Sequence, residues 1–270
     1  MTDYVVGLVV LSSLLHLTWN ATIRSSEGNL VLVWLLVLSG GIMTAIVTLV
    51  LGIPWDLSTI WPWSFATILV HTAYFWTLAR SYRQGALQEV YPVARGGGIL
   101  LTMLVTREVF HQSLSIDLFV GTLLIALTII IQPWNQLMHR QILTWALFVA
   151  AFIALYSVID SHSVHLVSPW PYVSLQYLGT AFALTPQVLK CQRSLPVFRG
   201  ILSGIASVLS YLLILYAYRL APVGPVLALR QVSIGVAPIV GWLLFRERWR
   251  WSVFFRALVM LVGVGLILIG

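Results

Sequence analysis

The sequence predicts an all-α membrane protein with ten transmembrane helices, and three observations support this. Of its 270 residues, 60% are apolar and 9% are charged, whereas a soluble domain carries about 25% charged residues. The mean hydropathy is +0.96. Apolar runs of about 20 residues, the length that crosses a bilayer, recur along the whole chain. Such a chain leaves only short loops between its helices.

The helices are placed by cutting the chain at charges, Pro-Trp pairs and glycines. They are expected near 4–22, 30–52, 61–79, 86–106, 115–132, 142–160, 170–189, 200–218, 223–245 and 251–269. The first run has Asp3 where a secretory signal peptide has basic residues, so it is expected to be a retained helix. Tryptophans lie at the predicted ends, as amphipathic rings do at membrane interfaces: Trp55, Trp61, Trp63, Trp134, Trp170, Trp249 and Trp251.

The basic residues are distributed unequally between the two sides of the predicted bundle. One set of alternate loops carries ten of them: Arg24, Arg80, Arg83, Arg140, Lys190, Arg193, Arg199, Arg246, Arg248 and Arg250. The other set carries only Arg107 and Arg219. We expect the protein in the cell (inner) membrane. Since cytoplasmic loops are enriched in Lys and Arg, the basic side is expected to face the cytoplasm and both termini to lie outside. The charges form no stripe, so no nucleic-acid partner is expected despite a net charge of +7.

The chain divides into two halves of similar pattern, residues 1–135 and 136–270. Residues 80–132 and 216–270 each contain a Tyr/Arg loop, a helix rich in Gly and Pro with an internal arginine, an Arg-Glu loop and a last apolar helix. Five helices per half place equivalent loops on opposite sides, so the two repeats are expected to be inverted. Inverted repeats with interrupted helices are the architecture of many secondary transporters, whose substrate sites lie near the midplane.

The interrupted helices are predicted at Tyr91–Gly98 and around Pro225–Pro238, and each holds one arginine, Arg95 or Arg230. An arginine deep in the membrane costs about 2.5–3.5 kcal/mol on insertion scales, so each needs a partner or a wet cavity. We expect the two to bind a carboxylate, phosphate or phosphonate. The alternatives are ion pairs with Glu89 or Asp160, or contacts with backbone carbonyls at the helix breaks.

Other polar residues extend this predicted site. His16, Trp19 and Asn20 share a helix face, and so do Tyr156 and Asp160. Trp19, Asn20, Tyr91 and Tyr156 are expected to line the substrate cavity, and Asp160, Glu89 or His16 to carry coupled protons. For His16, Trp19 and Asn20 the alternative is packing at the helix end. For Asp160 the alternative is a solvated position at a helix end.

A second group of polar residues has two equally good interpretations. Interhelical hydrogen bonds explain this group as well as substrate contact does: His71, Tyr74, Gln176, Tyr177 and Tyr211. Asp160, His162 and His165 form only a weak metal pattern. We therefore predict no metal and no cofactor.

Three motifs in order resemble the drug/metabolite transporter superfamily, EamA-type, in a branch marked by His-x-x-Trp-Asn. They are His16-Leu17-Thr18-Trp19-Asn20, Tyr91-Pro92-Val93-Ala94-Arg95-Gly96, and the segment from Leu229-Arg230-Gln231 to Gly241 and Glu247-Arg248. The resemblance implies ten helices, two inverted repeats and alternating-access transport of a small metabolite through a central cavity. Some members of this branch are associated with phosphonate use. The chain departs from the family at Thr106-Arg107-Glu108, which replaces a Gly-Glu-Arg ending, and in its predicted external termini.

Together these features predict a secondary transporter, monomeric or homodimeric, for a small anionic or zwitterionic metabolite. The alternatives are a flippase for a lipid-linked polar headgroup and a multidrug or amino-acid exporter. An integral-membrane enzyme is disfavoured because no nucleophile with a base, metal cluster or carboxylate pair has credible spacing.

Overall fold

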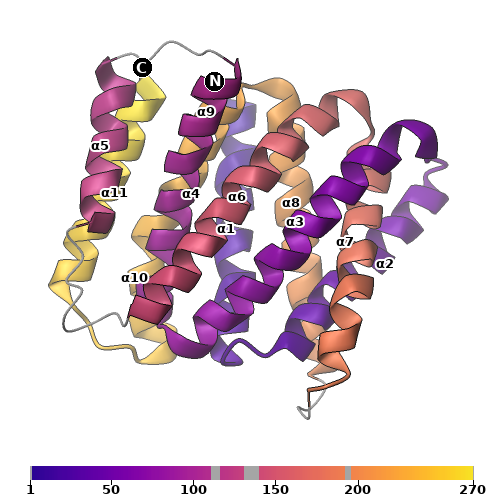
Figure 1. Cartoon of the computed structure of the whole chain (residues 1–270), viewed down its shortest axis with the longest axis horizontal. Coiled ribbons are helices and arrows are strands. Elements are labelled where there is room, and N and C mark those ends of the chain that lie inside the picture. Colours follow the sequence, from indigo (N-terminus) through magenta and orange to yellow (C-terminus); the bar gives the residue numbers. More distant parts are fainter. Residues whose placement is uncertain (1, 111–115, 131–139, 192–195, 270) are drawn as a thin grey trace.

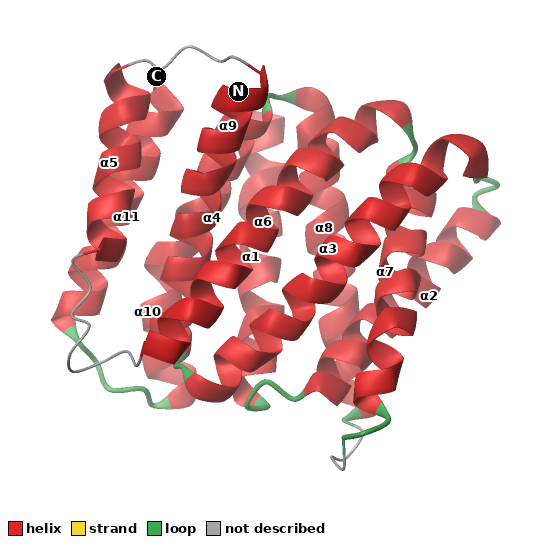
Figure 2. Cartoon of the chain, viewed as in Figure 1, coloured by secondary structure: helices red, strands yellow, loops and turns green. Residues whose placement is uncertain are grey.

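The computed structural model describes residues 2–110, 116–130, 140–191 and 196–269, and within these ranges all regular elements are helices, joined by short loops (Figures 1 and 2). The helices in order are α1 (Asp3–Ser25), α2 (Leu30–Val50), α3 (Leu57–Gln84), α4 (Leu87–Phe110), α5 (Ile116–Ile130), α6 (Arg140–Leu166), α7 (Pro169–Val188), α8 (Val197–Leu220), α9 (Val223–Leu229), the 3-10 turn η1 (Arg230–Val232), α10 (Ser233–Phe245) and α11 (Trp251–Ile269). Trp134 and Arg193, used in the sequence argument, lie outside the described residues.

Six of the described segments are long and apolar enough to cross a membrane. They are α1, α2, α6, α8, α11 through Leu268, and the continuous stretch Val223–Phe245 formed by α9, η1 and α10. A shorter apolar helix spans Phe119–Ile129. Helices α3, α4 and α7 are of similar length but contain more polar residues, many of which are buried in the interior. Six spans and one shorter helix support a polytopic bundle, and the count of ten spans stays a prediction.

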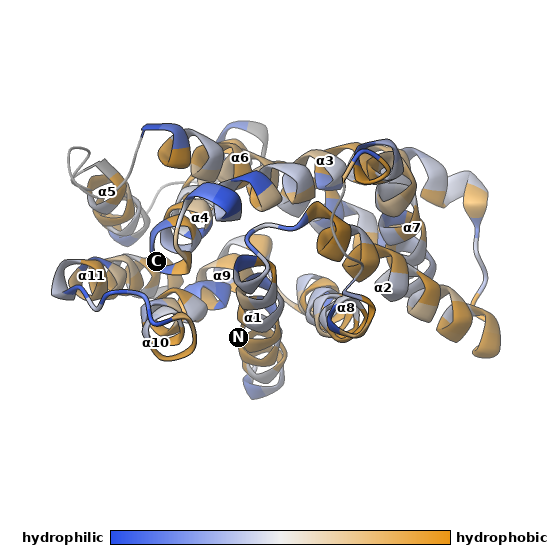
Figure 3. Cartoon of the chain, turned by 90° about the horizontal axis from the view of Figure 1, so that it is seen from below, coloured by the Kyte–Doolittle hydropathy of each residue, from blue (hydrophilic) through white to orange (hydrophobic). Residues whose placement is uncertain are grey.

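Helices from the two halves of the chain pack against each other rather than forming separate bundles. α1 packs on α8, α3 and α4 on α6, α2 on α7, and α5 on α11. The two ends of the chain lie at the same end of the bundle (Figure 1). Seen from the opposite end, hydrophobic residues dominate the outward sides of peripheral helices such as α2, α7 and α10 (Figure 3). We call this opposite end, where the Arg-rich loops gather, the basic end.

The predicted interruption of the fourth helix is wrong. α4 is continuous through Pro92 and Gly96–Gly98. Its glycines instead permit close packing, since a Cβ on Gly97 would lie 3.0 Å from Ala150 Cβ and one on Gly98 would lie 2.7 Å from Ile153 Cγ2. Both neighbours belong to α6. Pro92 stands only about one turn and a half into α4, where a missing N–H removes little of the hydrogen-bond ladder.

The ninth segment is interrupted, as its sequence predicts. α9 ends at Leu229, the 3-10 turn covers Arg230–Val232, and α10 starts at Ser233. Pro225 and Pro238 lie on either side of this turn. The turn places Arg230 at a change of helical geometry within the interior of the bundle.

Candidate functional site

The backbone at the helix interruption is held by three polar side chains. The Arg230 carbonyl oxygen accepts hydrogen bonds from Ser13 Oγ at 3.0 Å, Arg95 Nη2 at 3.1 Å and Ser233 Oγ at 3.3 Å. Irregular backbone at membrane depth is tolerated only where its polar groups are satisfied inside the protein. These bonds connect α1, α4 and α10 at one carbonyl, so side chains from three helices stabilise the interruption.

Arg95 and Arg230 themselves are deeply buried, each with 1% of its surface exposed. Nε and Nη1 of both guanidinium groups have no hydrogen-bond partner among the described residues. The ion pairs of the described chain, Arg24–Glu247 and Arg107–Glu108, involve neither. The contact with a carbonyl at the break is therefore confirmed for Arg95, whereas ion pairs with Glu89 or Asp160 are wrong. Two buried cations thus retain donors that an anion would satisfy.

A small closed cavity lies beside Arg230. Its volume is about 20 Å³, enough for roughly one water molecule. It is lined by His16, Trp19, His71, Tyr74, Phe75, Tyr156, Tyr177, Ser207, Ser210, Tyr211 and Arg230. Ligand sites for small molecules are usually ~300–1,000 Å³, so the described conformation is closed around this point.

Asn20 and Tyr91 were predicted to line the cavity but are not among its lining residues. Both contact His16, which does line it. Nδ1 of His16 accepts from the Asn20 amide at 3.1 Å and lies 3.3 Å from the Tyr91 hydroxyl. Tyr91 also bonds Ser233 Oγ at 2.8 Å, and Tyr82 donates to Asn20 Oδ1 at 3.0 Å. The His-x-x-Trp-Asn segment thus places His16 and Trp19 at the cavity, with Asn20 orienting the imidazole.

Asp160 is fully buried, which contradicts the alternative of a solvated helix end. Its carboxyl oxygens accept hydrogen bonds from the hydroxyls of Thr67, Tyr172 and Tyr211. Thr67 Oγ1 lies 2.9 Å from His71 Nδ1. Because Tyr211 and His71 both line the cavity, Asp160 is connected to it through two short hydrogen-bonded routes.

Glu89 is not part of this site. It begins α4, where its Oε2 accepts from the backbone N–H of Ala86 at 3.1 Å. The residues of the weak metal pattern also lie apart, because His162 packs against Trp63 with tilted rings whose centroids are 4.8 Å apart. Within the described ranges no three metal-ligating side chains come together.

Apart from Tyr156, the aromatic side chains around the cavity were not among the predicted substrate residues. His71 stacks on Tyr156 with centroids 4.5 Å apart, and Tyr74 and Tyr211 meet this pair edge-on. Their sequence signal was weak because each is a single polar residue in an apolar helix. Only the packing of α3, α6 and α8 brings them together.

Trp19 also borders a second hollow. An open groove of about 330 Å³ lies between α1 and α8, and Trp19, Thr22 and Arg199 are among the residues that line it. Trp19 lines both this groove and the closed cavity. Its indole Nε1 is buried without a hydrogen-bond partner among the described residues. Trp19 is thus the side chain that separates the cavity from the groove.

At the basic end, Glu247, which follows α10, connects α10 to the start of α4 and to the end of α1. Its carboxylate accepts the backbone N–H groups of Leu87 at 2.9 Å and Gln88 at 3.3 Å, and it pairs with Arg24 at 3.5 Å. Glu247 therefore caps the start of α4 from a distant part of the chain. Gly241 is required nearby, because any Cβ there would collide with the Glu247 carboxylate.

Comparison with known proteins agrees with this architecture. Residues 140–269 match the EamA-like transporter family. This match supports membership of the EamA-like drug/metabolite transporter superfamily. The chain is accordingly a multi-pass membrane protein and a membrane transporter of the drug/metabolite kind. The match falls in the second half of the chain, and assignment to the His-x-x-Trp-Asn branch stays a prediction.

A solved crystal structure has the same fold as this EamA-like protein. The two overlay with a TM-score of 0.74 over 100% of this chain and 99% of the other, at 16% sequence identity. At that identity the likeness concerns the fold alone. No curated protein matches the sequence.

Proposed function

We propose that this protein is a secondary active transporter of a small anionic metabolite, with Arg230 as the main anion-binding residue. The observation that carries the proposal is the pair of buried arginines whose Nε and Nη1 groups lack partners among the described residues. A buried charge without a counter-charge costs several kcal/mol. A carboxylate, phosphate or phosphonate bound between Arg230 and Arg95 supplies that counter-charge, and the planar guanidinium favours such oxygens.

The other cavity residues support a polar substrate. Trp19 offers an indole N–H, and Tyr156 and Tyr211 provide aromatic walls with hydroxyl groups. His16, oriented by Asn20 and Tyr91, is placed to bond a second polar group of the substrate, which fits a zwitterion as well as a simple anion. Access requires an opening movement, because the cavity of about 20 Å³ is far smaller than any metabolite. Displacement of Trp19 toward the α1–α8 groove is the shortest such movement.

The packing of the helices supports the two-repeat organisation with halves 1–135 and 136–270. If α6 is equivalent to α1 and α8 to α3, the pairs α1–α8 and α3–α6 are the same contact made twice. The pairs α2–α7 and α5–α11 then join equivalent helices. This arrangement is the one expected for inverted repeats that rock about a shared site.

Asp160 is proposed as the proton carrier that couples transport to a gradient. Its three hydroxyl neighbours can donate to a carboxylate, and Tyr211 can accept from a protonated carboxyl group, so both charge states keep hydrogen bonds. Glu89 and His16, the other two predicted carriers, are bonded to their own surroundings.

The substrate class is tested by thermal unfolding of the purified protein with carboxylates, phosphates, phosphonates, amino acids and cationic drugs. A ligand at ~100 times its Kd adds about 2.7 kcal/mol of stability if it binds only the folded state. We expect an anion to stabilise the wild type and the control Arg140→Gln, a change at an exposed residue, but not Arg230→Gln. Stabilisation by cations alone, or by an anion equally in Arg230→Gln, would overturn the proposed site.

Coupling is tested in proteoliposomes with the anion that this screen selects. Asp160→Asn should abolish uptake driven by a pH gradient and leave exchange of labelled for unlabelled substrate largely intact. Gradient-driven uptake that persists in Asp160→Asn would show that the proton is carried elsewhere.

A flippase is the second candidate, and the α1–α8 groove favours it. The groove is open and includes Thr18, Thr22 and Ser203, so a polar headgroup could travel along it while its acyl chains stay in the bilayer. A fluorescent-lipid translocation assay separates the two candidates, since a soluble-anion transporter leaves lipid asymmetry unchanged.

A further inference from the structure

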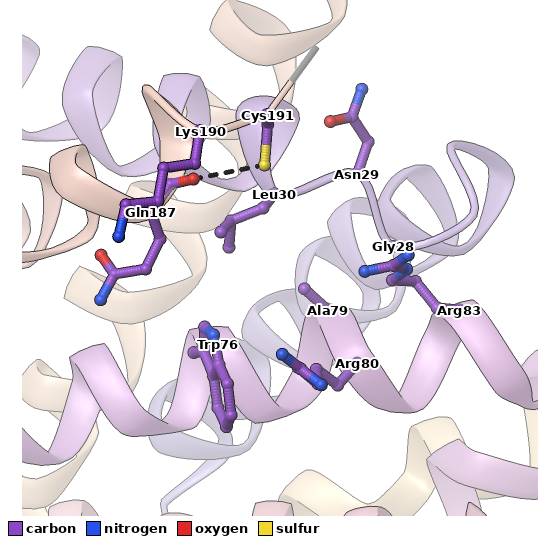
Figure 4. Close-up of a pocket in the computed structure, with 10 residues that line it drawn as sticks. All are labelled: Gly28, Asn29, Leu30, Trp76, Ala79, Arg80, Arg83, Gln187, Lys190 and Cys191. Atoms are coloured by element: carbon purple, nitrogen blue, oxygen red, sulfur yellow. Dashed lines mark hydrogen bonds between the residues drawn. The ribbon is translucent and has the colours of Figure 1, made fainter. Parts of the chain in front are cut away.

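A second hollow, remote from the central cavity, opens at the basic end of the bundle (Figure 4). Its volume is about 410 Å³. It is lined by Arg80 and Arg83 near the end of α3, by Gln187 in the last turn of α7, and by Lys190, which follows that helix (Figure 4). The turn at Gly28–Leu30, between α1 and α2, forms the third side. We call this hollow the basic pocket.

We propose that the basic pocket binds the phosphate-bearing headgroup of an anionic membrane lipid. Three of its ten lining residues are cationic, and none of the ten is Asp or Glu. Within the described residues, no ion pair engages Arg80, Arg83 or Lys190. Three cations lining one hollow without an acid favour an anion of more than one negative charge or several oxygens, such as a phosphate group.

Among the described residues, no hydrogen bond or ion pair within the protein explains why these three cations line one hollow. Arg219 makes such bonds at the opposite end of the bundle, where it donates to the carbonyls of Val164 at 2.6 Å and Val167 at 2.7 Å. Arg83 has no comparable bond in the described chain. Arg80 stacks on Trp76, with its guanidinium carbon 4.4 Å from the ring centroid, and this leaves the edge of its donor fork unbonded. The indole therefore holds Arg80 in place without consuming its N–H groups.

The pocket is held rigidly by the α1–α2 turn. Gly28 has a φ of +63°, a conformation that favours glycine, and any Cβ there would collide with the Ala79 carbonyl oxygen of α3. The turn thus lies directly on α3, against Ala79 and the side chain of Arg83. It also directs the start of α2, capped by Asn29, toward the pocket, where helix N–H groups favour negative charge.

The position of the pocket favours a lipid over a soluble phosphate ester. It lies at the ends of membrane-embedded helices, at the depth where headgroups are found, and basic pockets between helices are known headgroup sites. Leu189, the neighbour of Lys190, has 81% of its surface exposed, and Phe182 in α7 has 84%. Leu189 gives acyl chains an apolar contact next to the charged pocket, and Phe182 gives them another farther along α7. A soluble anion would gain nothing from them.

The proposal is tested by native mass spectrometry of the detergent-purified protein with added phosphatidylglycerol or phosphatidylcholine. We expect wild type to retain phosphatidylglycerol in preference to phosphatidylcholine. The triple variant Arg80→Gln/Arg83→Gln/Lys190→Gln should bind phosphatidylglycerol on the order of 100-fold more weakly, at about fivefold per charge. The control Arg140→Gln removes an exposed charge at the same end and should bind as wild type does. All three pocket cations are exposed, so the variant should keep the wild-type melting temperature, which is checked in parallel.

Two results would overturn the proposal. Equal retention of phosphatidylglycerol by wild type and the triple variant would show that the cations are merely solvated. Displacement of the lipid by equimolar glycerol 3-phosphate would identify a soluble phosphate ester as the ligand. Neither result bears on the central cavity, whose test uses Arg230.

Discussion

α4 and the segment α9–η1–α10 have the same sequence signature and different structures. Each contains prolines or a glycine cluster around one arginine, yet α4 runs unbroken from Leu87 to Phe110 while the other segment changes to a 3-10 turn at Arg230. In α4 the glycines face α6 closely. In the ninth segment the prolines stand on both sides of the turn. Gly and Pro therefore indicate either a helix that packs closely on its neighbour or a helix that is interrupted. The packing of the neighbouring helices determines which of the two occurs.

The two arginines differ in the same way. Arg95 reaches from an intact helix to the carbonyl of the broken one. Arg230 lies at the break and lines the cavity. Two residues that are equivalent in sequence therefore have different surroundings: Arg95 supports the broken backbone, and Arg230 borders the cavity.

The largest expected effect tests this difference between the two arginines. Arg230→Gln should weaken binding of the anion found by ligand screening by roughly 10- to 100-fold, the value of a hydrogen bond to a charged group. Arg95→Gln should weaken it less and lower the melting temperature more, because it releases the Arg230 carbonyl. Thermal-shift titrations of both variants give affinity and stability together. Equal losses of affinity would mean that the arginines act as a symmetric pair.

The glycines provide the next test. Gly98→Ala places a methyl group 2.7 Å from Ile153 Cγ2 and 3.0 Å from its Cβ, and we expect a loss of about 1–3 kcal/mol from overpacking. At Gly235 the nearest atom is the terminal Cδ1 of Leu261 at 2.5 Å, which can rotate away. Gly235→Ala should therefore cost less.

Gly7→Ala is the control for this pair, since nothing lies within 4 Å of its Cβ position. It should be neutral or stabilising by up to ~1 kcal/mol through helix propensity. Apparent melting temperatures of the three variants in one detergent measure the order. A Gly98→Ala variant as stable as wild type would contradict the close α4–α6 packing.

The smallest effect concerns two glutamates, Glu247 just after α10 and Glu108 in the last turn of α4. The Glu247 side chain is 6% exposed and caps α4, whereas that of Glu108 is 80% exposed and lies 3.9 Å from Arg107. Glu247→Gln should cost about 1 kcal/mol as a lost charged cap. Glu108→Gln should stay within about 0.5 kcal/mol, as exposed pairs do. Melting temperatures in low and high salt distinguish them, because only the exposed pair is strongly screened.

The helices could be predicted from the sequence because each apolar run is bounded by charges or tryptophans, and most expected bounds lie close to the observed ones. The arginines and the His-x-x-Trp-Asn face were visible for the same reason, since polar residues stand out in apolar runs. The aromatic side of the cavity could be predicted only in part. Tyr156 was expected there, but His71 and Tyr211 could not be placed beside it, because the three residues come from three helices with no shared spacing. The intact α4 was missed because Ile153, which explains Gly98, lies 55 residues away in sequence.

The single cysteine of the chain gives the protein a natural label for its own orientation. Cys191 is half-buried on the wall of the basic pocket, beside Lys190. A membrane-impermeant maleimide applied to intact cells reaches it only if the basic end faces outward, and no engineered cysteine or fused reporter is needed. With the basic end in the cytoplasm, labelling should begin only after the cells are permeabilised. The same thiol would then report, by its rate of labelling, when a headgroup occupies the pocket.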